Sequence, residues 1–143
     1  MSDNPKSFNL SPELHRYMLA HGTAPDAIQQ GLIEATSKLG GVSVMQIAPE
    51  QGALMTMLTQ LIGATRAIEV GTFTGYSALC IARGLPKDGQ LICRDVSDEW
   101  TSVGVPFWEK AGVRAFNEKI AKDPRVDCVM LAISDGLTFL RVL

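Results

Sequence analysis

A short apolar run that leads into a glycine-bounded turn constrains the fold of this chain more than any other feature. Residues 67–70 are mostly apolar, Gly71 and Gly75 bound the turn that follows, and residues 76–83 show helical spacing. Strand, turn and helix in this order begin a doubly wound α/β sheet, in which ligands bind at the carboxyl ends of the strands. The glycines allow close approach of the backbone, and free amides at the helix start can bind an anion. The turn is therefore the candidate ligand site.

An acid at the end of the next strand narrows the class of ligand. The turn Pro86–Gly89 is followed by a predicted strand over Gln90–Asp95, and Asp95 stands about 20 residues after the glycine turn, where a carboxylate can accept both ribose hydroxyls. These features indicate an adenosine-containing cofactor. NAD is disfavoured because its fingerprint needs three glycines, G-x-G-x-x-G, and this turn has two. A purely structural turn, with Asp95 as a solvated acid that begins the next helix, is the alternative.

Helical patterns precede this unit. We predict one helix from Ser11 to near Gly22, a second over Pro25–Leu39, a short extended segment over Val42–Ile47, and a third helix from Ala48 to Gly63. The third helix carries four apolar residues that we expect to face inward: Leu54, Leu58, Leu61 and Ile62.

Two more helices and a hairpin are predicted to follow. A helix over Asp98–Ala111 contains Gly104 and Pro106, which should weaken or kink it, and a shorter helix covers Arg114–Lys122. A β-hairpin closes the chain, with strands over Val126–Ile133 and Leu137–Leu143 around the turn Ser134–Gly136.

Composition excludes several classes of protein. The 143 residues fit one domain, and 13 Lys+Arg against 15 Asp+Glu give a net charge of 13 − 15 = −2, which provides no electrostatic footprint for nucleic acid. There is no apolar run of about 18 residues for a membrane span and no secretory signal pattern. The three scattered cysteines, Cys80, Cys93 and Cys128, are expected to be reduced core thiols in a cytoplasmic protein.

Longer segments of the chain carry the pattern of a known family. They are Met45–Gly52, Ile68–Ala78, Pro86–Gly89, Glu109–Val113, Phe116–Val126 and Ser134–Thr138. Together they closely resemble the class I, cation-dependent O-methyltransferases of the caffeoyl-CoA and catechol type. The resemblance covers nearly all of the chain from about residue 10, and the last segment is similar to the family's C-terminal hairpin.

This resemblance implies a shortened Rossmann-like fold that binds S-adenosylmethionine (SAM), with N-terminal helices, a mostly parallel sheet and a C-terminal antiparallel hairpin. It divides the single domain, residues 1–143, into a helical cap (1–48), a SAM-binding half (49–113) and a C-terminal helix with the hairpin (114–143). The implied reaction is methyl transfer from SAM to a hydroxyl of a small aromatic acceptor. The implied partners are that small molecule and a second copy of the chain, in a homodimer that strand exchange could form, with no nucleic acid or membrane.

The resemblance also assigns cofactor contacts residue by residue. It places Met45 and Ile47 at the methionine side, with Gln46 helping to close the site and Glu69 and Gly71 framing the pocket. Tyr76 and Ser77 are placed at the amino-acid end, and Asp95 at the ribose. Simple packing between helices remains an alternative for Met45 and Ile47. The complete implied set is Met45, Gln46, Ile47, Glu69, Gly71, Thr72, Phe73, Gly75, Tyr76, Ser77 and Asp95.

The catalytic half of the family's pattern is missing. In the family, a divalent cation of the Mg²⁺ type lowers the pKa of the acceptor hydroxyl, and its ligands come from an Asp-rich turn after the fourth strand and an Asp-Asn pair after the fifth. Neither motif occurs here, and Val113 is followed directly by Arg114. We therefore expect the third, fourth and fifth strands to be absent, and we assign no catalytic residue and no metal ligand.

Three explanations for the missing block remain open: an internal deletion, a domain-swapped assembly, and the omission of a middle stretch from the sequence. They leave a second functional hypothesis, in which the chain is a catalytically inactive remnant that binds SAM or a partner.

Overall fold

A short parallel sheet forms the centre of the structure, a computed structural model that describes residues 10–113, 116–117, 126–131 and 137–142. Its strands are β1 (Arg66–Val70), β2 (Gln90–Arg94) and β3 (Phe116–Asn117), in the order β1-β2-β3. Arg66 pairs with Gln90 and Val70 with Arg94, so β1 and β2 end together. The predicted α/β class and the first two strands are confirmed.

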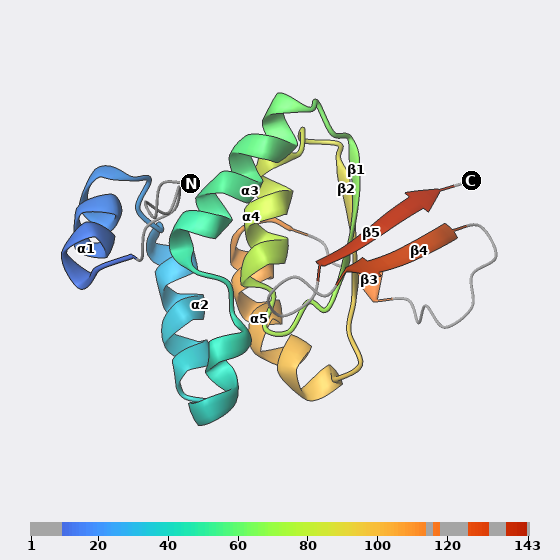
Figure 1. Cartoon of the computed structure of the whole chain (residues 1–143). Helices are drawn as coiled ribbons and strands as arrows, with labels where there is room; N and C mark the ends of the chain where they lie inside the picture. The colour runs from blue at the N-terminus through green and yellow to red at the C-terminus, as the bar shows by residue number, and fades with distance from the viewer. Residues whose placement is uncertain (1–9, 114–115, 118–125, 132–136, 143) are drawn as a thin grey trace, which may run out of the picture.

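The helices lie on one side of this sheet (Figure 1). They are α1 (Pro12–His21), α2 (Ala27–Ser37), the 3₁₀ helix η1 (Gly40–Met45), α3 (Pro49–Leu61), α4 (Tyr76–Gly84) and α5 (Asp98–Lys110). Helix α4 packs on β2, and the helices α2 and α3 pack on α4. Figure 1 shows α2, α3, α4 and α5 grouped on one side of the β1–β2 pair, with α1 farthest from the sheet. Across the described residues, every helix is too short or too polar to cross a membrane.

Two apolar clusters hold these layers together. Leu32, Tyr76, Leu79, Cys80 and Trp108 form the cluster between the helices, and each is at most 2% exposed. A smaller cluster of Ala78, Leu91 and Cys93 joins α4 to β2. Since α4 contributes to both clusters, the helix that follows the glycine turn is the central element of the core.

The C-terminal hairpin forms a second sheet. Strands β4 (Val126–Leu131) and β5 (Leu137–Val142) pair antiparallel, with Val126 opposite Val142 and Leu131 opposite Leu137. The predicted hairpin is confirmed for these residues. Its predicted turn, Ser134–Gly136, lies outside the described residues.

The predicted helix over Arg114–Lys122 is wrong at its described residues. Phe116 and Asn117 form β3, parallel to β2 with Phe116 opposite Ile92. The reason is the end of α5, where Gly112 takes φ 72° and the Val113 amide donates to the Trp108 carbonyl oxygen at 2.9 Å. This left-handed cap reverses the chain and returns it along β2. Two residues thus occupy the position beside β2 where we expected no third strand, and the remainder of the predicted helix lies outside the described residues.

The predicted extended segment Val42–Ile47 is also wrong, because Gly40–Met45 is a 3₁₀ helix. Tight turns already begin at the end of α2, where the Leu39 amide donates to the Thr36 carbonyl oxygen at 3.0 Å. Gly40, at φ 70°, continues the turn, and the Gln46 amide closes it on the Ser43 carbonyl oxygen at 3.1 Å. These local hydrogen bonds outweigh the preference of Val42 and Val44 for extended backbone.

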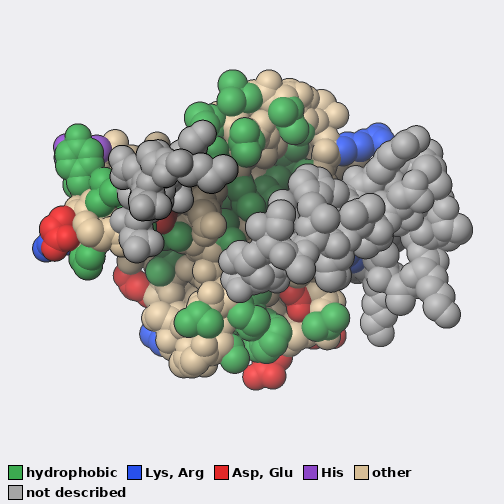
Figure 2. All heavy atoms as spheres, in the orientation of Figure 1, with side chains coloured by type: hydrophobic (Ala, Val, Ile, Leu, Met, Phe, Trp, Pro, Cys, Tyr) green, Lys and Arg blue, Asp and Glu red, His purple; other side chains and the backbone are tan. Residues whose placement is uncertain are grey.

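The inward orientation that we predicted for the α3 leucines is contradicted. Leu54 and Leu58 are each 47% exposed, Leu61 is 72% exposed and Ile62 is 75% exposed. The opposite face of α3 packs on α4 instead: Gly52 and Thr59 are buried, and Thr56 Oγ1 donates to the Cys80 carbonyl oxygen at 2.7 Å. Small residues allow this close helix contact, so the leucines face outward. Figure 2 shows hydrophobic side chains gathered on the surface over α3.

Helix α5 runs without interruption through Gly104 and Pro106, where we expected a weak or kinked helix. Gly104 is buried against the Thr74 carbonyl oxygen, and a Cβ at this position would collide with that atom. The glycine therefore brings α5 close to the glycine turn.

Candidate functional site

Three left-handed residues shape the loop between β1 and α4. Gly71, Phe73 and Gly75 have φ values of 83°, 52° and 79°. The Gly71 amide donates to the Arg94 carbonyl oxygen at 2.8 Å, and the Gly75 amide donates to the Thr72 carbonyl oxygen at 2.8 Å. The first bond fixes the loop to β2, and the second closes it as a tight turn before α4.

Asp95 braces this loop. Its Oδ2 accepts a hydrogen bond from the Phe73 amide at 2.6 Å, and its Oδ1 accepts one from the Ser97 amide at 2.9 Å. One carboxylate therefore holds both the loop and the entry to α5. Sequence reasoning placed Asp95 beside the loop but missed this role, which nothing in the local sequence signals.

We expect Asp95→Asn to destabilise the chain by about 1–3 kcal/mol, because the amide group keeps one acceptor oxygen for two backbone donors and leaves one half-buried donor unpaired. Urea denaturation measures the difference. Asp98→Asn, at an exposed carboxyl of α5, is the control, and a loss no greater than that of the control would contradict the bracing role.

The first turn of α4 has no side-chain cap. Side chains of Ser11, Asp26 and Ser97 cap α1, α2 and α5, whereas the N-cap residue of α4 is Gly75, and α4, like α3, begins without a side-chain cap hydrogen bond. Its leading amides point out of the helix start, where the positive end of the helix dipole also lies. A carboxylate or phosphate would satisfy them.

A buried hydrogen-bond network supports the loop from behind. Trp108 Nε1 donates to the Gly75 carbonyl oxygen at 3.1 Å, and the Thr36 and Thr74 hydroxyls lie 2.7 Å apart. Sequence reasoning missed Trp108, Thr36 and Thr74 as supporting residues. A tryptophan at helical spacing indicates a core position for Trp108, but no sequence signal couples α2 to the loop.

The end of η1 meets the loop and forms a recess of ≈ 40 Å³. The predicted site residues from 45–47 and from 71–77 all line it, and Thr74 is an addition that sequence reasoning missed. Glu69 and Asp95 lie outside its lining. The recess is far smaller than the several hundred Å³ that a whole cofactor requires, so it can hold one end of such a molecule.

Glu69 is the site's unusual titratable group. Burial raises the pKa of its carboxyl to about 7, hydrogen bonds with Ser77 and Thr72 lower it in part, and the negative charge of Asp95 adds to the rise. Its Oε2 is buried and has no hydrogen-bond partner among the described residues. A cationic group placed there would favour the ionised form.

We also examined the described residues for side chains that could form a metal site. No group of three or more His, Cys, Asp or Glu side chains among these residues is arranged to hold a metal ion. Cys80 and Cys93 are buried free thiols, and burial raises the pKa of both.

Comparison with known proteins identifies the family. The family model described as O-methyltransferase matches residues 20–115, more than half of the chain. The chain belongs to the O-methyltransferase family. This match ends at residue 115, two residues beyond Val113, where the break was predicted.

Two curated relatives, both from plants, match most of this chain. The chain is 40% identical over 114 residues to tricin synthase 2 of Oryza sativa subsp. japonica, covering 78% of this chain and 39% of that protein. It is 40% identical over 106 residues to caffeoyl-CoA O-methyltransferase of Populus kitakamiensis, covering 72% and 45%. The chain therefore spans less than half the length of these relatives.

A solved structure shares the fold. The O-methyltransferase TomG from Streptomyces achromogenes, in complex with SAM, is 25% identical and aligns with a TM-score of 0.67, covering 73% of this chain and 48% of TomG. The expected Rossmann-like methyltransferase fold, in shortened form, is confirmed.

Proposed function

We propose that this protein binds SAM at the loop between β1 and α4 and transfers its methyl group to a hydroxyl of a small aromatic acceptor. The observation that carries the proposal is the uncapped, left-handed glycine loop within a chain of the O-methyltransferase family. The names of its relatives, caffeoyl-CoA and flavonoid methyltransferases, support a phenolic acceptor. The SAM complex of TomG supports the cofactor.

The residues present fit the amino-acid end of SAM. The uncapped amides of α4, beside Tyr76 and Ser77, suit its carboxylate, and the unpaired Oε2 of Glu69 suits its ammonium group. Gln46 also has a buried side-chain oxygen without a partner among the described residues, at the edge of the recess. When bound, SAM supplies an electrophilic methyl group, and these residues would orient it.

The roles that we propose for the other predicted cofactor contacts follow from where these residues lie. Met45 and Ile47 would cover the methionine side, while Gly71, Thr72 and Phe73 would keep the backbone close to the ligand. Asp95 would approach the ribose with lone pairs that its bonds to Phe73 and Ser97 leave free.

The divalent cation of the family has no ligand set among the described residues. We derive no step through it and assign no general base. The second candidate is a chain that binds SAM without transferring the methyl group. A methyl-transfer assay with a catechol and Mg²⁺ separates the two, because product formed by this 143-residue chain would eliminate the non-catalytic candidate.

We also infer a single domain with the divisions predicted above, and a homodimer whose contact includes the outward face of α3 and the edge of β1 that does not pair with β2. That face carries Leu54, Leu58, Leu61 and Ile62, and among the described strands β1 pairs with β2 alone; exposed apolar faces and unpaired strand edges favour pairing with another chain. The two buried free thiols support a reducing, cytosolic location.

Leu61→Lys tests the dimer. Because Leu61 is exposed, we expect the variant to retain the stability of the monomer within about 0.5 kcal/mol while its dimer dissociation constant rises at least about tenfold. Sedimentation equilibrium measures the constant. Leu19→Lys, at an exposed apolar residue of α1, should leave association unchanged, and equal association of all three chains would eliminate this interface.

A further inference from the structure

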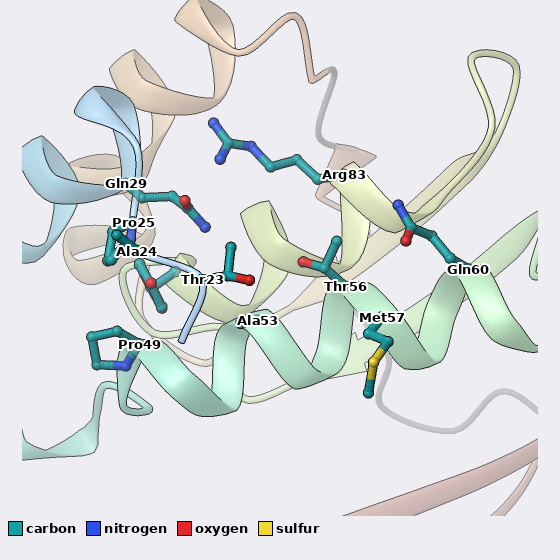
Figure 3. A pocket seen from close by; sticks show the side chains of 11 residues that line it. Thr23, Ala24, Pro25, Gln29, Pro49, Ala53, Thr56, Met57, Gln60 and Arg83 are labelled. Atoms are coloured by element: carbon teal, nitrogen blue, oxygen red, sulfur yellow. The ribbon is translucent and has the colours of Figure 1, made fainter. Parts of the chain in front are cut away.

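A second pocket lies in the helix layer, apart from the recess at the glycine loop (Figure 3). It has a volume of ≈ 350 Å³ and is bounded by residues 23–25, α2, α3 and α4. This volume falls in the range of sites that bind small organic molecules, about 300–1,000 Å³. The proposed methyl transfer does not use this pocket, and Tyr76 alone lines both it and the recess.

The pocket has a cation at one end. Arg83, in the last turn of α4, places Nη2 2.5 Å from Asp26 Oδ2. The other oxygen of Asp26 accepts from the Ile28 and Gln29 amides at 2.9 and 3.0 Å, so α2 already compensates part of its charge. A guanidinium carries five N–H donors, and the bond to Asp26 occupies one nitrogen. Arg83 therefore keeps donors for a ligand in the pocket that it lines.

The geometry of the surrounding side chains is fixed. Gln29 accepts from the Asp26 amide through Oε1 at 3.0 Å and donates through Nε2 to Cys80 Sγ at 3.2 Å, so both ends of its amide are held. Figure 3 shows the Arg83 guanidinium on the side of the pocket where Gln29 lies, with Ala53 and Thr56 on the facing helix α3. The charged end of the pocket is thus preorganised by bonds that exist before any ligand arrives.

The rest of the lining is mainly apolar. Pro25, Pro49, Ala53 and Met57 line the pocket together with the aromatic ring of Tyr76. A planar, apolar body can lie against the rings of the two prolines and the tyrosine, and its polar end would meet the cation.

We propose that this pocket binds a small organic carboxylate with a flat apolar body, held by its carboxylate on Arg83. A planar guanidinium matches a planar carboxylate in a paired hydrogen-bond geometry. A phosphate dianion is a poorer match, because Arg83 is the only cationic side chain among the described residues that line this pocket and shares its charge with Asp26.

Benzoate is the probe for the full chain, and benzamide is its neutral counterpart of the same shape. In titrations of ¹⁵N-labelled protein followed by NMR, we expect benzoate to bind with a dissociation constant of about 1 mM and to shift the amide signals of Ala53, Thr56 and Arg83. Benzamide should bind at least about tenfold more weakly.

Substitutions locate the binding site and distinguish the effect of the Arg83 charge from a loss of folded structure. Arg83→Gln should weaken benzoate at least about tenfold and Arg83→Lys less so, since lysine keeps the charge without the planar fork. Ala53→Phe should abolish benzoate binding by filling the pocket. Lys87→Gln, at an exposed cation outside the pocket, should leave the affinity for benzoate unchanged. The far-UV circular dichroism of each variant verifies folding.

Three outcomes would overturn the proposal. They are no binding at a benzoate concentration of about ten times the expected dissociation constant, equal affinity for benzamide, or changes in amide signals confined to Gly71–Ser77. The last outcome would place the anion at the start of α4, which is the site proposed for SAM. Failure of SAM to bind would leave the benzoate result unaffected, because the two sites share only Tyr76 and the cation that would hold benzoate, Arg83, lines the pocket only.

Discussion

Replacing Gly75 by alanine is expected to destabilise the chain by about 2–5 kcal/mol, the sum of about 1–2 kcal/mol for a left-handed non-glycine residue and about 1–3 kcal/mol for overpacking. Gly75 has φ 79°, and an added Cβ would overlap the indole ring of Trp108. The ring has little freedom to move, because it is 2% exposed and its Nε1 donates to the Gly75 carbonyl oxygen. Thermal and urea denaturation measure the loss.

Gly71→Ala is the matched control for this variant. Gly71 also has a left-handed φ, 83°, but nothing lies within 4 Å of its added Cβ. It should therefore lose about 1–2 kcal/mol, from backbone conformation alone. Equal losses in the two variants would show that Trp108 does not pack against the loop as the structure describes.

The second large effect is expected from Glu69→Gln. The pKa of the Glu69 carboxyl rises in the folded chain from 4.5 to about 7, so folding disfavours its ionised form. Stability is therefore full below pH 4.5, falls as the pH rises through the interval from 4.5 to 7, and stays low above it, a total of about 3 kcal/mol. Glutamine cannot ionise, so the variant should be more stable than the natural chain at pH 8 and similar to it near pH 4.

Urea denaturation at several pH values measures this difference. Glu109→Gln, at an exposed carboxyl of α5, should show no such pH-dependent gain. The same Glu69→Gln variant should bind SAM more weakly at pH 8, since it loses the carboxylate proposed for the ammonium group. A purely structural role for Glu69 would give the gain in stability without the loss in affinity, and a variant no more stable at pH 8 would contradict the raised pKa.

Features fixed by short stretches of sequence could be predicted. The β1-loop-α4 unit, β2 and the hairpin strands follow from apolar runs bounded by glycine, proline and Asp-Gly, and Ser11 and Pro12 mark the start of α1 correctly. Most of the recess lining also follows from local pattern and resemblance, because its residues lie in two continuous segments.

Features that depend on contacts between distant segments could not be predicted. The leucines of α3 have helical spacing, but which face turns inward is decided by Gly52 and Thr56 meeting α4. The strand at Phe116–Asn117 depends on a helix cap that turns the chain toward β2. The brace from Asp95 to the Phe73 amide joins residues 22 positions apart and has no local signature.

The central claim is that the loop between β1 and α4 binds SAM, and calorimetric titration of SAM into a sample of verified intact mass tests it most directly. We predict saturable binding at one site per chain, a rise in Tm with SAM concentration, and weaker binding in the Glu69→Gln variant. A folded sample that shows neither heat of binding nor a shift in Tm at saturating SAM would contradict the claim.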